Sequence, residues 1–130
     1  MKSIAFLLLV IVALVVSDNS KPTTNTTDKV VKVAWSKADS KAYARDKLSE
    51  WRDEQWSCLS KLWGKESAWN SNAFNPVRVM GKHAGGIPQL LGLDPDTPAP
   101  RQIERGLDYI YYRYGTPCEA WYHWKREGNY

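Results

Sequence analysis

A glutamate stands at the end of an apolar helical pattern in residues 59–70, which read LSKLWGKESAWN. Four residues have the spacing i, i+3, i+4 and i+7 and therefore share one helix face: Leu59, Leu62, Trp63 and Glu66. Burial on an apolar face disfavours a charged carboxylate, and so does the C-terminal end of a helix dipole, so both raise the pKa of Glu66. A carboxylic acid that stays protonated near neutral pH can act as the general acid of a glycosidase.

Glu66 also has a simpler interpretation, as a glutamate at the rim of a helix that reaches water or pairs with Lys65 or Arg113. Many glycosidases use two carboxylates, one on each side of the bond that they cleave. This chain has no Asp or Glu between residues 67 and 93, and the next acid, Asp94, lies in a proline-rich run typical of turns. If Glu66 is catalytic, we therefore expect it to act largely alone, with help from the substrate.

The sequence GGIPQ at residues 85–89 offers a partner for a sugar ring. Glycines such as Gly86 let the backbone approach a ligand closely, and Pro88, which follows Ile87, stiffens the turn. Gln89 supplies both a hydrogen-bond donor and an acceptor, which suits a sugar with amide substituents. The alternative is a plain turn with no ligand. The seven Trp and seven Tyr of the chain add stacking surfaces for sugars, although most of them should lie in the core.

Four helices are expected to position these residues. The first is predicted from Ala, Lys and Leu among polar neighbours, and the other three from the positions of their apolar side chains. The four segments are residues 35–49, about 52–66, 100–114 and 118–127. Tyr109 then lies at the edge of the apolar stripe of the third helix, beside a candidate groove. Residues 70–100 are rich in Asn, Gly and Pro and lack strand-like alternation, so we expect a loop with short helical turns. The predicted fold class is therefore all-α, with little or no sheet, in a single small domain over residues 35–130.

Residues 1–17 have the pattern of an export signal. Lys2 is followed by thirteen apolar residues, 4–16, a run too short to span a bilayer easily. We expect a cleaved signal peptide or, alternatively, an uncleaved membrane anchor, followed by a polar linker over residues 18–34. The protein would then be secreted to the cell envelope, or membrane-anchored and facing the wall. The formal net charge of +4 suits an anionic partner but is equally normal for a soluble domain.

Cys58 and Cys118 are the two cysteines of the chain. In an exported protein we expect one disulfide, which would close a loop of about 60 residues and stabilise the fold by roughly 3–4 kcal/mol. The alternatives are two buried thiols or a redox pair, and the wide spacing argues against a redox site. The sequence has no metal-binding motif, no phosphate-binding glycine loop and no nucleotide fingerprint. We therefore expect no metal, no cofactor and no nucleic-acid partner.

Several segments, in this order along the chain, resemble the lysozyme-like domain of soluble lytic transglycosylases, above all the short version found in actinobacteria and their phages. They are WSCLSKLWGKESAWN (56–70), FNP (74–76), GIPQ (86–89), QIERGLDYIYYRYGTPCEAWYH (102–123) and EGNY (127–130). The combination of ES, then GIPQ, then the long segment ending in AWYH is specific. The resemblance implies an α-helical lysozyme-like fold over nearly all of residues 50–130. We expect the protein to be a monomer.

The resemblance also implies roles for individual residues. Glu66 matches the single catalytic acid and base of the family, and Ser67 the residue beside it, which supports the local structure. The residues that match the substrate groove are Gly86, Ile87, Pro88, Gln89 and Tyr109. Asn75 stands where many larger relatives have a serine near the substrate. Cys58 and Cys118 match a disulfide pair of the short type.

The family cleaves the β-1,4 bond between N-acetylmuramic acid and N-acetylglucosamine in the glycan strands of peptidoglycan. Glu66 would protonate the glycosidic oxygen, and the N-acetyl group of the substrate would stabilise the positive sugar carbon. Glu66 would then accept the proton of the muramic acid 6-hydroxyl, which closes a 1,6-anhydro ring without water. This scheme needs one carboxylate. The alternatives are a hydrolytic lysozyme acting on the same bond, a peptidoglycan-binding module without activity, and a small membrane-active protein.

The chain departs from the family pattern at the segment VRVMGKHAG, residues 77–85, which is longer than the usual connection. It carries Arg78, Lys82 and His83. A longer segment here can reshape the groove or change the choice of substrate.

Overall fold

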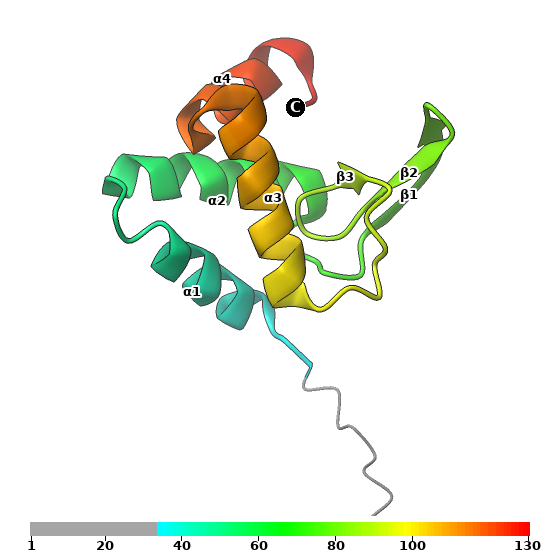
Figure 1. The fold of residues 1–130 in the computed structure, drawn as a ribbon, viewed down its shortest axis with the longest axis horizontal. Helices are drawn as coiled ribbons and strands as arrows, with labels where there is room; N and C mark the ends of the chain where they lie inside the picture. The colour runs from blue at the N-terminus through cyan, green and yellow to red at the C-terminus, as the bar shows by residue number, and fades with distance from the viewer. Residues whose placement is uncertain (1–33) are drawn as a thin grey trace, which may run out of the picture. The chain divides into compact units, whose positions relative to one another are not determined.

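The computed structural model describes residues 34–130, so the predicted signal or anchor over residues 1–17, and the linker except for Ala34, lie outside the described residues. Four helices and three strands follow one another along the chain (Figure 1). They are α1 (Lys37–Lys47), α2 (Asp53–Ser67), β1 (Phe74–Val79), β2 (Lys82–Gly85), β3 (Leu90–Leu91), α3 (Ala99–Tyr114) and α4 (Pro117–Glu127). The four predicted helices are confirmed, with ends that differ by at most two residues from those expected.

The expectation of an all-α fold is wrong, because residues 74–91 form a three-stranded antiparallel sheet in the order β1-β2-β3. The fold is therefore α+β. Every residue of β1 is exposed, so this strand shows none of the alternation that sequence analysis requires. It also contains Pro76, which an edge strand tolerates because the missing N–H has no partner to lose. Strand β3 has two residues, too few to show a pattern.

Local signals fix the ends of the helices. At α1, Ser36 and Asp39 form a capping box, in which each side chain accepts a hydrogen bond from the backbone of the other residue. Helix α3 ends at Gly115, which has a positive φ of 84°. Helix α2 ends differently, because Ala68 and Trp69 both adopt left-handed backbone conformations, with φ of 51° and 59°. Such conformations cost free energy for residues with a Cβ, so packing must hold this turn in place.

The core lies between the four helices, α1 to α4, and the loop that joins β2 to β3. Its fully buried members include Leu59, Leu62, Trp63, Ile87, Ile103, Ile110 and Ala120. Trp69, from the left-handed turn, packs edge-on against Trp63 with ring centroids 5.3 Å apart. The apolar stripes predicted for the second and third helices therefore face this core, as amphipathic helices do.

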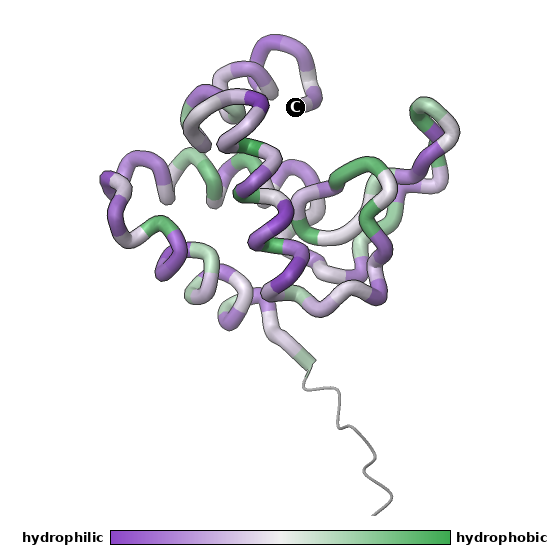
Figure 2. The backbone as a smooth tube through the Cα atoms, in the orientation of Figure 1, coloured by the Kyte–Doolittle hydropathy of each residue, from purple (hydrophilic) through white to green (hydrophobic). Residues whose placement is uncertain are grey.

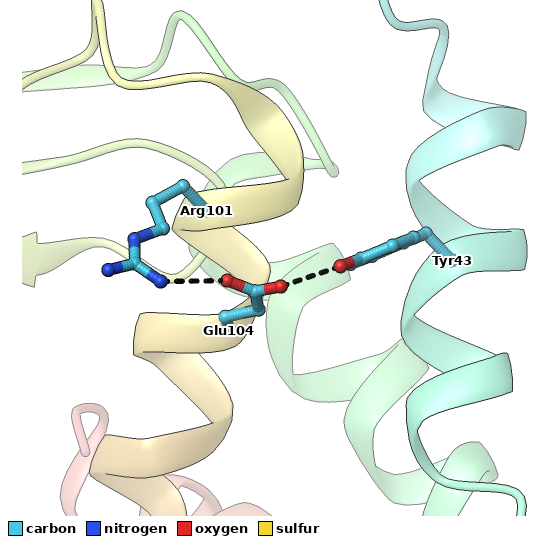
Figure 3. A network of polar contacts seen from close by, with 3 residues as sticks. All are labelled: Tyr43, Arg101 and Glu104. Atoms are coloured by element: carbon cyan, nitrogen blue, oxygen red, sulfur yellow. Dashed lines mark hydrogen bonds and ion pairs between the residues drawn. The ribbon is translucent and has the colours of Figure 1, made fainter.

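Helix α1 contacts α3 through a polar network that Figure 3 shows. The Tyr43 hydroxyl donates to Glu104 Oε1 at 2.6 Å, and Arg101 Nη1 donates to Glu104 Oε2 at 3.1 Å. These two donors hold the pKa of Glu104 below its usual value, so the carboxylate is charged when it binds them.

The predicted disulfide is confirmed. It joins Cys58 of α2 to Cys118 of α4, whose Cα atoms are 4.9 Å apart, and it spans 60 positions of sequence. A disulfide is typical of proteins in an oxidising compartment. Among residues 34–130, no helix combines the length and the apolar character needed to cross a bilayer.

Candidate active site

Glu66 lies in the last turn of α2, where its side chain is half-buried. Burial raises the pKa of Glu66 above its ordinary value, and the side chain of Trp124, which can only donate through its indole N–H, partly offsets this increase in pKa. The two ion pairs within residues 34–130 do not involve Glu66, so the alternative of pairing with Lys65 or Arg113 is not observed there. The carboxyl group is therefore biased towards its protonated form by its surroundings.

Ser67 connects the end of α2 to the loop over residues 86–89. Its hydroxyl donates to the carbonyl oxygen of Ile87 at 2.7 Å and also lies 3.3 Å from the carbonyl oxygen of Trp63. Ile87 is fully buried, so the loop is anchored beneath the helix end by its side chain as well. The two motifs that carry the predicted site, ES and GIPQ, are thus joined directly although they lie 20 residues apart.

Gln102 of α3 holds the same loop from the other side. This fully buried side chain accepts a hydrogen bond from the Ile87 N–H at 2.9 Å through Oε1. Its Nε2 lies 2.9 Å from the Ser71 carbonyl and 2.8 Å from the Thr97 carbonyl, with a third carbonyl at 3.3 Å. No sequence pattern had indicated a role for Gln102. The sequence feature that could have identified Gln102 is its position next to Ile103, in the apolar stripe of the third helix.

Gly86 and Gln89 both adopt left-handed conformations, with φ of 71° and 51°. A Cβ at Gly86 would lie 2.5 Å from Gln102 Oε1, so no larger residue fits against this amide. The side chain of Gln89 folds back, and its Nε2 donates to the carbonyl oxygen of Gly86 at 3.0 Å. Within residues 34–130 its Oε1 accepts no hydrogen bond, which leaves this oxygen available to a ligand or to water.

A groove of about 420 Å³ opens beside this loop. It is lined by Gln89, Leu90, Leu91, Arg105, Asp108, Tyr109 and Tyr130. Two of the predicted binding residues, Gln89 and Tyr109, line this groove. Their role in substrate binding stays a prediction. Asp108 also lines the groove, and sequence analysis did not consider this exposed carboxylate.

Tyr130 connects the groove to α2, the helix that carries Glu66. Its hydroxyl accepts a hydrogen bond from Trp63 Nε1 at 2.9 Å and donates to the carbonyl oxygen of Pro88 at 2.7 Å. Burial raises the pKa of Tyr130 well above its usual value, and the negative charge of Glu66 raises this pKa further. The Tyr130 ring packs against Tyr109, with centroids 5.6 Å apart. The segment EGNY contributes to the sequence resemblance, but no sequence pattern indicated a role for Tyr130 or Trp124 in the site.

The contacts of Asn75 do not connect it to the groove or to the loop over residues 86–89. It is exposed on β1, where its Oδ1 accepts a hydrogen bond from the Val77 N–H at 3.0 Å and its carbonyl oxygen lies 3.0 Å from His83 Nδ1. The side-chain oxygen and the carbonyl oxygen of Asn75 therefore both form contacts within the β1–β2 hairpin. A binding role for Asn75 stays a prediction without support from these contacts.

The arrangement combines a carboxyl group of raised pKa, a loop fixed on two sides and a groove lined by tyrosines and by polar groups. A carboxyl group of raised pKa can transfer a proton to a ligand that reaches it. Glu66 itself is not among the residues that line the groove. Residues 34–130 contain no cluster of three or more His, Cys, Asp or Glu side chains able to hold a metal ion. Comparisons with protein families, with curated proteins and with solved structures found no match to this chain.

Proposed function

We propose that the protein is an exported lytic transglycosylase with a lysozyme-like fold, which acts as a monomer on the glycan strands of peptidoglycan. The observation that carries the proposal is the position of Glu66: a half-buried carboxyl group of raised pKa, tied through Ser67 to the loop that borders an aromatic groove. The sequence resemblance described above supports the same conclusion, and the disulfide agrees with an exported protein.

In this proposal Glu66 acts first as an acid and then as a base. Its proton passes to the oxygen that leaves with N-acetylglucosamine, and the bond from that oxygen to C1 of N-acetylmuramic acid breaks. The N-acetyl group of the same sugar stabilises the positive charge at C1. The carboxylate then accepts the proton of the 6-hydroxyl while the 6-oxygen bonds to C1, so Glu66 is protonated again and no water is consumed. The raised pKa favours the first step, because it keeps the proton on Glu66 at higher pH.

The groove would hold the sugars on either side of the scissile bond. The free Oε1 of Gln89 is suited to an amide N–H of an N-acetyl group, and the ring of Tyr109 offers an apolar face for a sugar. Tyr130 and Gln102 would act through the loop, since both bond to its backbone. They are positioning residues in this scheme.

Asp108 favours a second candidate, hydrolysis of the same bond. A glycosidase that uses water needs a second carboxylate facing the bond, and Asp108 lines the same groove as Gln89 and Tyr109. If Asp108 activates a water, the products carry ordinary reducing ends. If it only binds or borders the glycan, the 1,6-anhydro products remain.

The test is a mass spectrum of the soluble products that the full chain releases from purified peptidoglycan. Transglycosylation predicts products one water lighter than ordinary muropeptides, formed by the wild type and by Asp108→Asn. Glu66→Gln should lower their rate of release by about 10²–10⁴, the usual contribution of a general acid. Glu50→Gln is the matched control, because it makes the same change at an exposed glutamate away from the groove.

The other outcomes each contradict the proposal in a distinct way. Products with reducing ends that disappear with Asp108→Asn would make the protein a hydrolase. If the wild type and Glu66→Gln both sediment with peptidoglycan and neither releases a soluble product, the protein is a binding module.

A further inference from the structure

The hairpin of β1 and β2 carries apolar side chains that the fold leaves in solvent. Val77 is 64% exposed, Val79 50% and Met80 90%. The hairpin projects away from the helices (Figure 1), and its tip carries hydrophobic residues (Figure 2). Met80 and Gly81 have φ of 52° and 76°, so two consecutive left-handed residues make the tight turn that a two-residue hairpin loop requires. The exposure of these side chains is therefore built into a defined turn.

Two cations flank these apolar residues. Arg78 precedes Val79 on β1, and Lys82 pairs directly with Val79 across the ladder. No Asp or Glu occurs between residues 67 and 93, and neither cation takes part in the ion pairs of residues 34–130. Arg78 Nε instead donates to His83 Nε2 at 3.1 Å, which keeps the guanidinium on the hairpin. The tip therefore joins aliphatic side chains to positive charge that no neighbouring carboxylate balances.

We propose that this tip, defined as residues 77–82, docks on an anionic lipid surface, with Val77, Val79 and Met80 entering the interface between headgroups and acyl chains. Aliphatic side chains beside Lys and Arg are the composition that such an interface binds, because it offers apolar depth and negative charge together. This proposal goes beyond the proposed enzymatic function and does not depend on it.

The charge complementarity favours lipid over other occupants. Protection of an edge strand from pairing would explain Pro76 and Arg78, but it gives no reason for three exposed apolar side chains beside them. The same two residues also disfavour docking of β1 on a second copy of itself. A glycan would call for an aromatic platform at the tip, and residues 77–82 contain no aromatic residue. Phe74, which is exposed, lies at the other end of β1 from the turn, where its ring packs against His83.

Docking would also orient the candidate site. Strand β2, which begins at Lys82, pairs with β3 through Ala84 and Leu91, and Leu91 lines the groove. The hairpin and one wall of the groove thus belong to one sheet. A tip held at the lipid surface would fix the height of the groove above it.

The test places an environment-sensitive fluorophore at the tip of the full chain, through Met80→Cys. The two native cysteines form the disulfide, so the new thiol is the one that reacts. Tyr112→Cys is the control, because Tyr112 is 85% exposed on α3, outside the sheet. With vesicles of phosphatidylglycerol and phosphatidylcholine, the label at position 80 should shift to the blue and be quenched by spin-labelled lipid, whereas the label at 112 should stay in water.

The charge contribution is tested with the label kept at position 80. Combining Arg78→Gln with Lys82→Gln should raise the lipid concentration needed for half of the shift by about ten- to thirtyfold, since each cation near an anionic surface contributes about a factor of five. The wild-type tip should show a similar increase in the lipid concentration needed for half of the shift when the vesicles contain phosphatidylcholine alone.

Several results would overturn the proposal. If the protein sediments with anionic vesicles while the label at 80 stays in water, the binding comes from another part of the chain. An equal shift with neutral and anionic vesicles would contradict the role of Arg78 and Lys82. A shift produced by purified peptidoglycan and not by vesicles would assign the tip to the wall polymer, and self-quenching without lipid would assign it to a second copy.

Discussion

Replacing Tyr130 by phenylalanine removes one oxygen atom from the centre of the candidate site. The ring stays, so its packing against Tyr109 and Tyr114, with centroids 5.6 and 6.1 Å away, is retained. The change removes the hydroxyl that accepts from Trp63 Nε1 and donates to the carbonyl oxygen of Pro88. Tyr130→Phe therefore isolates the contribution of two hydrogen bonds.

The size of the effect follows from the burial of the partners. Trp63 is fully buried, so its indole N–H would be left without an acceptor, which costs about 1–3 kcal/mol. Loss of the bond to Pro88 adds about 0.5–1.5 kcal/mol. We expect Tyr130→Phe to lower the free energy of unfolding by roughly 2–4 kcal/mol. For a domain of this size the melting temperature should fall by on the order of 10 °C or more.

The assay is urea unfolding of the full chain with its disulfide intact, followed by tryptophan fluorescence and by circular dichroism. Tyr112→Phe is the matched control, because it removes the same atom from a side chain that is 85% exposed. Such a surface change should stay within about 0.5 kcal/mol of the wild type. The activity of Tyr130→Phe in the peptidoglycan assay should also fall at temperatures where the variant is fully folded, because Pro88 borders Gln89.

A Tyr130→Phe variant as stable as Tyr112→Phe would refute this reasoning. It would mean that water replaces the hydroxyl at no cost, so the contact of Tyr130 with Trp63 and Pro88 does not hold the loop. A large loss of stability without any loss of activity in the folded protein would separate the two roles, and would limit Tyr130 to the fold.

Three further predictions concern the groups around this site. Burial raises the pKa of Glu66 in the folded protein. The contribution of this carboxyl group to stability is therefore fully present below its unfolded pKa and is lost as pH rises through its folded pKa. Glu66→Gln should have a higher urea midpoint than the wild type at pH 7, and the difference should shrink towards pH 4. Gly106→Ala should lower the free energy of unfolding by about 1–3 kcal/mol, because a Cβ there would lie 2.6 Å from an indole carbon of the core. Gly64→Ala, which meets nothing within 4 Å, should instead raise this free energy by about 0.5–1 kcal/mol. Gln102→Met keeps the length of the side chain but leaves the backbone groups that it bonds without partners, so it should lower the free energy of unfolding by about 2–4 kcal/mol.

The same urea titrations can contradict each of these three. A Glu66→Gln midpoint that follows the wild type at every pH would mean that burial does not disfavour the charge. Equal effects of the two glycine substitutions would contradict the close approach of α3 to the core. A Gln102→Met variant of wild-type stability would mean that the loop over residues 86–89 does not depend on this amide.

The helices and the environment of Glu66 were determined by local sequence. Leu59, Leu62 and Trp63 recur at the period of a helix, and the structure buries all three. Because Glu66 continues that spacing, its partial burial and raised pKa followed from its position in the chain. The disulfide was expected from the number of cysteines and from the predicted export signal. Each of these depends on neighbours a few residues away or on simple counts.

The sheet could not be found in this way. Strand β1 is exposed along its whole length, so no alternation of apolar and polar residues marks it. Its stability comes from backbone hydrogen bonds to β2 and from a tight turn at Met80 and Gly81. Backbone hydrogen bonds are available to nearly every residue, so they leave little trace in the sequence.

Only the tertiary structure decided which residues complete the site. The bonds of Ser67 to Ile87, of Gln102 to Ile87 and of Tyr130 to Pro88 join residues 20, 15 and 42 positions apart. The same packing that brought these groups together left Asn75 on the hairpin and placed Asp108 on the groove. Helical periodicity identifies the face on which a side chain lies, but the partner that it meets there depends on how the elements pack, and packing is a property of the whole fold.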